Sequence, residues 1–110
     1  MLRLRLWTLD ARVRDGGLLT DRDRLRRILR EEAVRGGATV VGERFCVFDN
    51  GAVTGVLVLA QSHLSVHTWP EHSLASVDLL CCGGLDGEAV VHAIEARLGA
   101  EQARVSCLER

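Results

Sequence analysis

The pattern of apolar and polar positions along the chain predicts six strands and two helices. The first strand alternates apolar and polar residues through Leu2, Leu4 and Leu6 and, after a slip, Leu9. The other five predicted strands cover residues 39–48, 52–60, 64–68, 75–82 and 103–108. Asp49-Asn50-Gly51 predicts a hairpin turn between the second and third strands, and residues 70–73 predict a turn between the fourth and fifth.

Two segments carry apolar residues at helical spacing. Thr20 is predicted to cap the first helix, whose first turn holds Asp21 and Asp23 beside the positive end of the helix dipole. Gly36-Gly37 ends this helix, and a second helix is predicted over residues 85–98. The inward stripes of the two helices are Leu25, Ile28, Leu29 and Ala33, and Val90, Val91, Ile94 and Leu98.

The order β-α-β-β-β-β-α-β predicts an α+β fold. We expect a two-layer α/β sandwich, with a mainly antiparallel sheet and two helices on one face. The 110 residues fit one domain, 1–110. A core of this size is thin, so a partner subunit would stabilise it.

Composition narrows the function classes. The net charge of −1 gives no broad field that would attract nucleic acid or an anionic membrane, and acidic residues interrupt the arginines of segment 22–35, which reads as a solvated helix face. No apolar run is long enough to span a membrane, and Arg3 and Arg5 interrupt any signal-peptide core. Four cysteines without an export signal predict free thiols in a reducing cytoplasm.

All fourteen basic residues are arginine, and the chain contains no lysine. A pyridoxal-phosphate enzyme needs a lysine to hold its cofactor, and a lysine-amine nucleophile is excluded for the same reason. A carbonyl group that accepts electrons would therefore have to come from another source.

Reactive side chains concentrate between Thr54 and Cys82, within strands that should be apolar. One interpretation is a zinc site from His63, His67 and a cysteine, although no CxxC pair supports it. A serine–histidine hydrolase around Ser62 would lack the G-x-S-x-G elbow. A polar network without catalysis is the third interpretation.

Residues 54–71 read TGVLVLAQSHLSVHTWPE, and ASVDLLCCG follows at 75–83. This stretch closely resembles the bacterial and archaeal S-adenosylmethionine decarboxylase proenzymes, which depend on a pyruvoyl group. The specific part covers about 30 residues and is centred on S-H-x-x-x-H-T-W-P-E and the later D-x-x-x-C-G. Weaker similarity extends to Gly36-Gly37-Ala38-Thr39-Val40-Val41.

The resemblance implies that the chain cuts itself between Gln61 and Ser62. Ser62 would attack the preceding carbonyl, and elimination and hydrolysis of the ester would leave a pyruvoyl group derived from Ser62. Its ketone would form a Schiff base with the substrate amine and accept electrons as carbon dioxide leaves, which suits a chain without lysine.

The resemblance also assigns roles to individual residues. His67 would transfer the proton during processing, Thr54 would hold the acyl-shift intermediate, and Cys82 would return a proton to the substrate α-carbon. His63 would order the turn at Gln61-Ser62, where the chain would be cut; we call this turn the cleavage turn. Because a regular strand points Ser62 and His67 to opposite faces, we expect a tight turn or kink at Gln61-Ser62 that lets them meet.

Three further residues are assigned to the substrate S-adenosylmethionine. Phe48 would stack on the adenine, Glu71 would accept the ribose hydroxyls, and Trp69 lies in the same motif. Each assignment has a plainer alternative: Phe48 as core, Glu71 as a solvated turn residue, Trp69 as packing or a dimer contact. Cys82 could likewise be a small buried hydrophobic residue. Family members form homodimers with shared active sites, so a homodimer is expected.

Three departures from the family pattern keep alternatives open, and one is that the first strand lacks the tyrosine or phenylalanine often found near Ala11 and Arg12. Gln61 stands where relatives usually have glutamate, which should permit cleavage because only the backbone carbonyl reacts. The turn 49–52 is more polar than usual, and Asp49 could receive a basic substrate. A related pyruvoyl-dependent ornithine or arginine decarboxylase, or an unprocessed homologue that binds a partner subunit, therefore remains open.

Overall fold

The computed structural model describes residues 2–110, and each predicted strand and helix is present in it. The strands are β1 (Leu4–Val13), β2 (Val40–Val47), β3 (Val53–Leu59), β4 (Ser62–Trp69), β5 (Leu74–Cys82) and β6 (Ala100–Glu109). The helices are α1 (Gly16–Leu19), α2 (Arg22–Arg35) and α3 (Gly87–Leu98), and the 3₁₀ turn η1 (Pro70–His72) joins β4 to β5.

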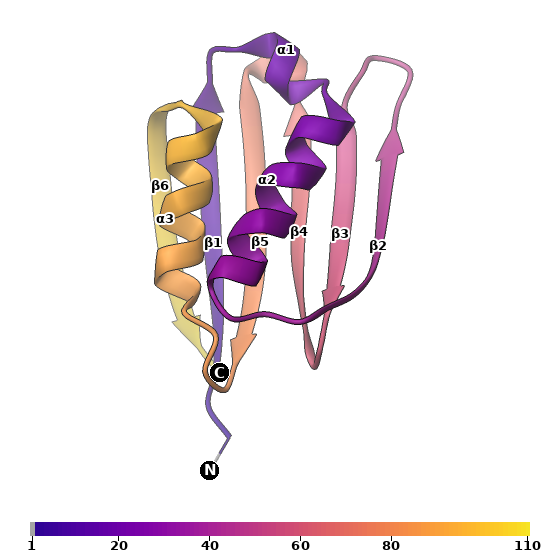
Figure 1. The fold of residues 1–110 in the computed structure, drawn as a ribbon. Helices are drawn as coiled ribbons and strands as arrows, with labels where there is room; N and C mark the ends of the chain where they lie inside the picture. The colour runs from indigo at the N-terminus through magenta and orange to yellow at the C-terminus, as the bar shows by residue number, and fades with distance from the viewer. Residues whose placement is uncertain (1) are drawn as a thin grey trace.

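The strands form one antiparallel sheet in the order β2-β3-β4-β5-β1-β6. Helices α2 and α3 lie across one face of this sheet, as Figure 1 shows. Hairpins join β2 to β3 and β3 to β4, so these strands are neighbours in both sequence and space. The predicted two-layer α/β sandwich, with its helices on one face, is confirmed.

The core lies between the helices and the sheet face made by odd-numbered positions of β1. Trp7, Leu9, Ala11 and Val13 are buried there, whereas Leu2 is 69% exposed. The predicted alternation through Leu2, Leu4 and Leu6 was therefore wrong about the buried face. Strand β1 carries apolar residues on both faces, so its sequence pattern does not say which one the helices cover.

The start of the first long helix also differs from the prediction. Asp21, not Thr20, is the N-cap of α2, and its carboxylate accepts a hydrogen bond from the Arg24 N–H. Thr20 instead ends α1, a one-turn helix that the sequence pattern did not reveal, and its hydroxyl donates back to the Gly16 carbonyl. Four residues are too few for helical periodicity to be recognised.

A buried carboxylate joins the two long helices. Glu32 in α2 is 2% exposed and accepts hydrogen bonds from Arg35 at 2.6 Å and from Arg97 of α3 at 3.0 Å. Burial pushes the pKa of Glu32 up, but the two arginine hydrogen bonds outweigh it, so the pKa lies below its ordinary value of 4.5.

Replacing Glu32 with glutamine is expected to lower the free energy of unfolding by about 1–2 kcal/mol near neutral pH. The expected loss is no larger because the Arg35 side chain is 70% exposed, so solvent screens its interaction with Glu32. Because the folded-state pKa is lowered, the stabilisation is present above the ordinary carboxyl pKa and is lost as pH falls through the lowered one. Urea unfolding of both proteins at about pH 7 and about pH 3 measures this. A difference that did not shrink in acid would contradict the assigned ion pair.

Within residues 2–110, no helix covers the second face of the sheet. A row of directly paired residues, apolar except for His63, crosses this face from β3 to β6: Val58, His63, Leu80, Leu6 and Leu108. Val58 is 48% exposed and Leu108 is 60% exposed. We call this the open face, and an apolar row of this kind is typical of a surface that binds a partner.

Candidate active site

The residues predicted to carry chemistry divide between the two ends of the sheet. Ser62 begins β4 and Cys82 ends β5, so both lie at the end where the chain termini are found. His67 and Thr54 lie toward the other end, near the β2–β3 turn (Figure 1). All of these residues lie within 29 residues of each other in the sequence. Because the chain runs back and forth in hairpins, they nevertheless lie at opposite ends of the sheet.

The β3–β4 hairpin turns sharply at Gln61. Gln61 has a φ of 62°, one of two non-glycine residues with positive φ among those described. This left-handed conformation costs a residue with a side chain on the order of 1–3 kcal/mol. The predicted tight turn at Gln61-Ser62 is therefore confirmed, and it places strain next to the peptide bond expected to break.

Two contacts hold this turn against β5. The Ser62 hydroxyl donates to the Leu80 carbonyl oxygen. The Cys82 thiol donates to the carbonyl oxygen of Gln61, with an Sγ–O distance of 3.5 Å. The thiol thus contacts the carbonyl that Ser62 would attack. Cys82 is half-buried rather than a core residue, so its alternative as a small buried hydrophobic residue loses support.

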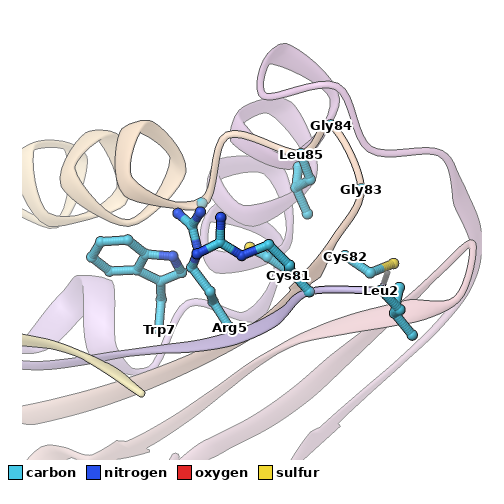
Figure 2. A pocket seen from close by; sticks show the side chains of 10 residues that line it. Leu2, Arg5, Trp7, Cys81, Cys82, Gly83, Gly84 and Leu85 are labelled. Carbon is cyan, nitrogen blue, oxygen red and sulfur yellow. The ribbon is translucent and has the colours of Figure 1, made fainter. Parts of the chain in front are cut away.

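Two cavities flank the turn that follows β5. A cavity of about 250 Å³ is bordered by both Ser62 and Cys82. A second, of about 390 Å³, is bordered by Cys82, Arg3, Arg5 and Trp7. Figure 2 shows the Cys81 sulfur near Trp7 and the Cys82 sulfur directed away from it. Burial raises the pKa of Cys81 to about 11, so this neighbouring thiol stays neutral.

His67 and Thr54 face each other across β3 and β4 on the open face. The Thr54 hydroxyl and the His67 Nδ1 atom are 3.1 Å apart. Trp69 continues the same face of β4, with its ring centroid 6.1 Å from that of His67. The structure therefore brings Thr54, His67 and Trp69 together, and we call them the histidine cluster.

The two remaining substrate residues lie beside this cluster, on the connecting turns. Phe48 follows β2 and is 53% exposed, so it is not a core residue. Glu71 lies in η1, directly after β4, and its carboxylate accepts a hydrogen bond from the Asn50 side chain at 2.8 Å. Asn50 had been predicted only as a turn residue.

Within one chain, Ser62 and His67 do not meet. They lie five residues apart on the same strand, which corresponds to about 16 Å. The turn at Gln61 kinks the chain before β4 but does not fold the strand back on itself. The expectation that a kink would bring Ser62 and His67 together within one chain was therefore wrong, and Thr54 lies with His67 rather than with Ser62.

The same geometry weighs against the zinc interpretation. His63 and His67 share the open face, but four residues along a strand separate them by about 13 Å, too far for one ion. Among residues 2–110, no group of three or more metal-binding side chains is gathered together. No helix in this range is long and apolar enough to cross a membrane.

The sequence analysis missed a polar pair beside the histidine cluster. Ser76 is paired with His67 across β4 and β5, and its hydroxyl donates to the Asp10 carboxylate at 2.7 Å. The sequence pattern did not single out either residue, because each occupies an ordinary polar position in an alternating strand. Only the register of β1 and β5 could reveal their proximity.

Comparison with known proteins agrees with this fold and motif. The class that the fold and the site define is that of the S-adenosylmethionine decarboxylases, whose family profile matches residues 5–110. The chain therefore belongs to the S-adenosylmethionine decarboxylase family.

Individual relatives come from both bacteria and archaea. A Symbiobacterium thermophilum S-adenosylmethionine decarboxylase proenzyme is 40% identical over 104 residues, covering 94% of this chain and 79% of the relative. A Pyrococcus abyssi proenzyme is 39% identical over 97 residues, covering 87% and 70%. A Pseudomonas paraeruginosa proenzyme is 40% identical over 81 residues, which span 73% of this chain but only 51% of that protein.

The fold also matches a solved structure. The adenosylmethionine decarboxylase of Aquifex aeolicus superimposes with a TM-score of 0.84 at 30% sequence identity, covering 99% of this chain and 90% of that one. The likeness therefore extends over the whole sandwich and not only over the motif.

Proposed function

We propose that this chain is a self-processing, pyruvoyl-dependent decarboxylase that converts S-adenosylmethionine to its decarboxylated form, the aminopropyl donor for polyamine synthesis. The observation that carries the proposal is the cleavage turn. A strained Gln61 precedes Ser62, and the Cys82 thiol contacts the Gln61 carbonyl oxygen. Family membership supports the same activity.

The cleavage turn suits an acyl shift. Ser62 Oγ would bond to the Gln61 carbonyl carbon while the C–N bond breaks, and the Ser62 nitrogen would take up the proton. A donor at the carbonyl oxygen stabilises the negative charge that develops there, and the Cys82 thiol is such a donor. Release of the left-handed strain at Gln61 favours the same step.

The second step needs a base. His67 would remove the Cα proton of Ser62, so that the ester eliminates, the Gln61 carboxylate leaves and a dehydroalanine remains at residue 62. Water would then replace its nitrogen, which leaves as ammonia, and give the new N-terminal pyruvoyl group. Thr54 holds His67 Nδ1 at 3.1 Å and thereby orients the ring. The pyruvoyl group then supplies the electron sink that a chain without lysine cannot obtain from pyridoxal phosphate.

A homodimer would complete this site. His67 of one chain lies about 16 Å from its own Ser62. Two copies packed through their open faces, with strands running in opposite directions, would set the histidine cluster of each beside the turn at Gln61 and the open-face residue Cys82 of the other. The exposed apolar row on that face supports such packing. Four free thiols agree with a reducing cytoplasm.

The substrate residues would act from the same end as His67. Phe48 offers an exposed aromatic face for the adenine and the sulfonium cation, and Glu71 offers a carboxylate for the ribose hydroxyls. Cys82 would return a proton to the substrate α-carbon after carbon dioxide leaves. Asp49, in the same turn as Phe48, is the feature that favours a basic amino acid as the alternative substrate.

The proposal predicts that purified protein separates into chains 1–61 and 62–110, the second with a blocked N-terminus that reacts with carbonyl reagents. The processed protein is expected to release labelled carbon dioxide from S-adenosylmethionine. Intact mass spectrometry and parallel assays with S-adenosylmethionine, ornithine and arginine measure both. A chain that remains uncleaved would contradict the enzyme proposal. Activity on ornithine or arginine alone would contradict only the assignment of S-adenosylmethionine as the substrate.

A further inference from the structure

We propose that Asn50 is a positioning residue that holds Glu71 toward the ribose and so contributes to selection of a nucleoside substrate. This inference rests on the proposed function. Asn50 lies at the tip of the β2–β3 turn, 21 residues before its partner Glu71. The hydrogen bond joins the β2–β3 turn to η1, two turns at the same end of the sheet.

Two hydrogen bonds fix the Asn50 side chain, one that it accepts and one that it donates. Its Oδ1 accepts a hydrogen bond from the Ala52 N–H at 3.1 Å, and its Nδ2 donates to Glu71 Oε2 at 2.8 Å. Only one orientation of the amide satisfies both, since oxygen must face the N–H and nitrogen must face the carboxylate. The Phe48 N–H donates to the Ala52 carbonyl at 2.9 Å, so the turn itself is ordered.

Glu71 depends on this contact for its direction. The residue is exposed, on a three-residue 3₁₀ turn, and its carboxylate makes no ion pair with any residue in 2–110. A free glutamate side chain samples many rotamers, and fixing it before binding removes that entropic cost from the ligand. Asn50 occupies Oε2 and leaves Oε1 to accept from a ribose hydroxyl.

The same turn carries the stacking surface. Phe48 lies two residues before Asn50, and the Gly51 N–H donates back to the Phe48 carbonyl at 2.9 Å. The Asn50–Glu71 hydrogen bond therefore sets the spacing between a face for a base and an acceptor for the sugar attached to it. A free basic amino acid has neither group and would gain nothing from this spacing.

The test measures nucleoside binding by calorimetry, using 5′-methylthioadenosine and its 2′,3′-dideoxy counterpart. Asn50→Ala is expected to lower the affinity for 5′-methylthioadenosine, which has both ribose hydroxyls, by about 3- to 10-fold. The affinity for the dideoxy counterpart should not change. The Michaelis constant for S-adenosylmethionine should rise by a similar factor while kcat and the extent of cleavage stay the same. Asn50→Asp keeps the acceptor for the Ala52 N–H but repels Glu71, so it should weaken binding at least as much.

A double-mutant cycle separates this role from a general effect on the turn. In a Glu71→Ala background, Asn50→Ala should change nothing further, since the group it positions is gone. Equal weakening of both nucleosides, full additivity, wild-type affinity in Asn50→Ala, or no nucleoside binding by the unsubstituted protein each overturns the inference. Nucleoside binding that depends on Asn50 in a protein releasing no carbon dioxide would instead overturn the decarboxylase proposal alone.

Discussion

Co-expression of Ser62→Ala and His67→Ala chains is expected to restore cleavage that neither variant shows alone. The Ser62→Ala chain has no nucleophile, and the His67→Ala chain has no base for the elimination. In a mixed dimer, the intact Ser62 of one chain would face the intact His67 of the other. If the chains associate at random, about half of the His67→Ala chains lie in mixed dimers and should be cut.

Intact mass spectrometry reads the result, because only the His67→Ala chain should yield the fragments 1–61 and 62–110. Addition of hydroxylamine to the His67→Ala protein alone is expected to cleave any ester that has accumulated, which separates a failed elimination from a failed acyl shift. His92→Ala is the control, since His92 lies on α3, away from the open face and from the turn at Gln61, and this protein should be cut normally. Cleavage of the His67→Ala protein by itself would show that another base acts, and an uncut mixture would contradict the shared site.

The fold could be predicted from the sequence because turn residues and glycines bound most of its strands and helices. The Asp49-Asn50-Gly51 turn and the glycines at 36 and 99 bound segments whose apolar period is unambiguous. Strand β1 was the exception, since Leu4 and Leu6 lie on the open face and Leu9 on the core face. A strand that is apolar on both faces predicts two contacts, one with the helices and one with something else, without saying which is which.

The sequence motif proposed a set of candidate site residues but not their geometry. The motif predicts Ser62, His67 and Cys82 as site residues, but the expectation that a kink brings Ser62 and His67 together in one subunit was wrong. A strand rises about 3.3 Å per residue, so five residues are enough to separate them fully. Contacts that depend on register or on two turns meeting, such as Ser76 with Asp10 and Asn50 with Glu71, left no trace in the sequence pattern.

Cys82→Ala is expected to lower the rate of decarboxylation by about 10²- to 10⁴-fold, the loss typical of removing a positioned acid. The same substitution should slow self-cleavage more mildly, by about 10-fold, because the thiol also donates to the Gln61 carbonyl oxygen at 3.5 Å. The two effects separate in one experiment, since the cleaved fraction is followed by mass spectrometry and turnover is measured per processed chain.

Two further cysteine variants sharpen this prediction. Cys82→Ser keeps a donor for the Gln61 carbonyl and should therefore cleave faster than Cys82→Ala, while its poorer acid leaves decarboxylation slow. Cys81→Ala is the matched control: its thiol is adjacent in sequence but buried on the core side, with a pKa raised to about 11, so both rates should stay near those of the unsubstituted protein. Full decarboxylase activity in processed Cys82→Ala would remove Cys82 from the proton transfer and leave it only its place at the cleavage turn.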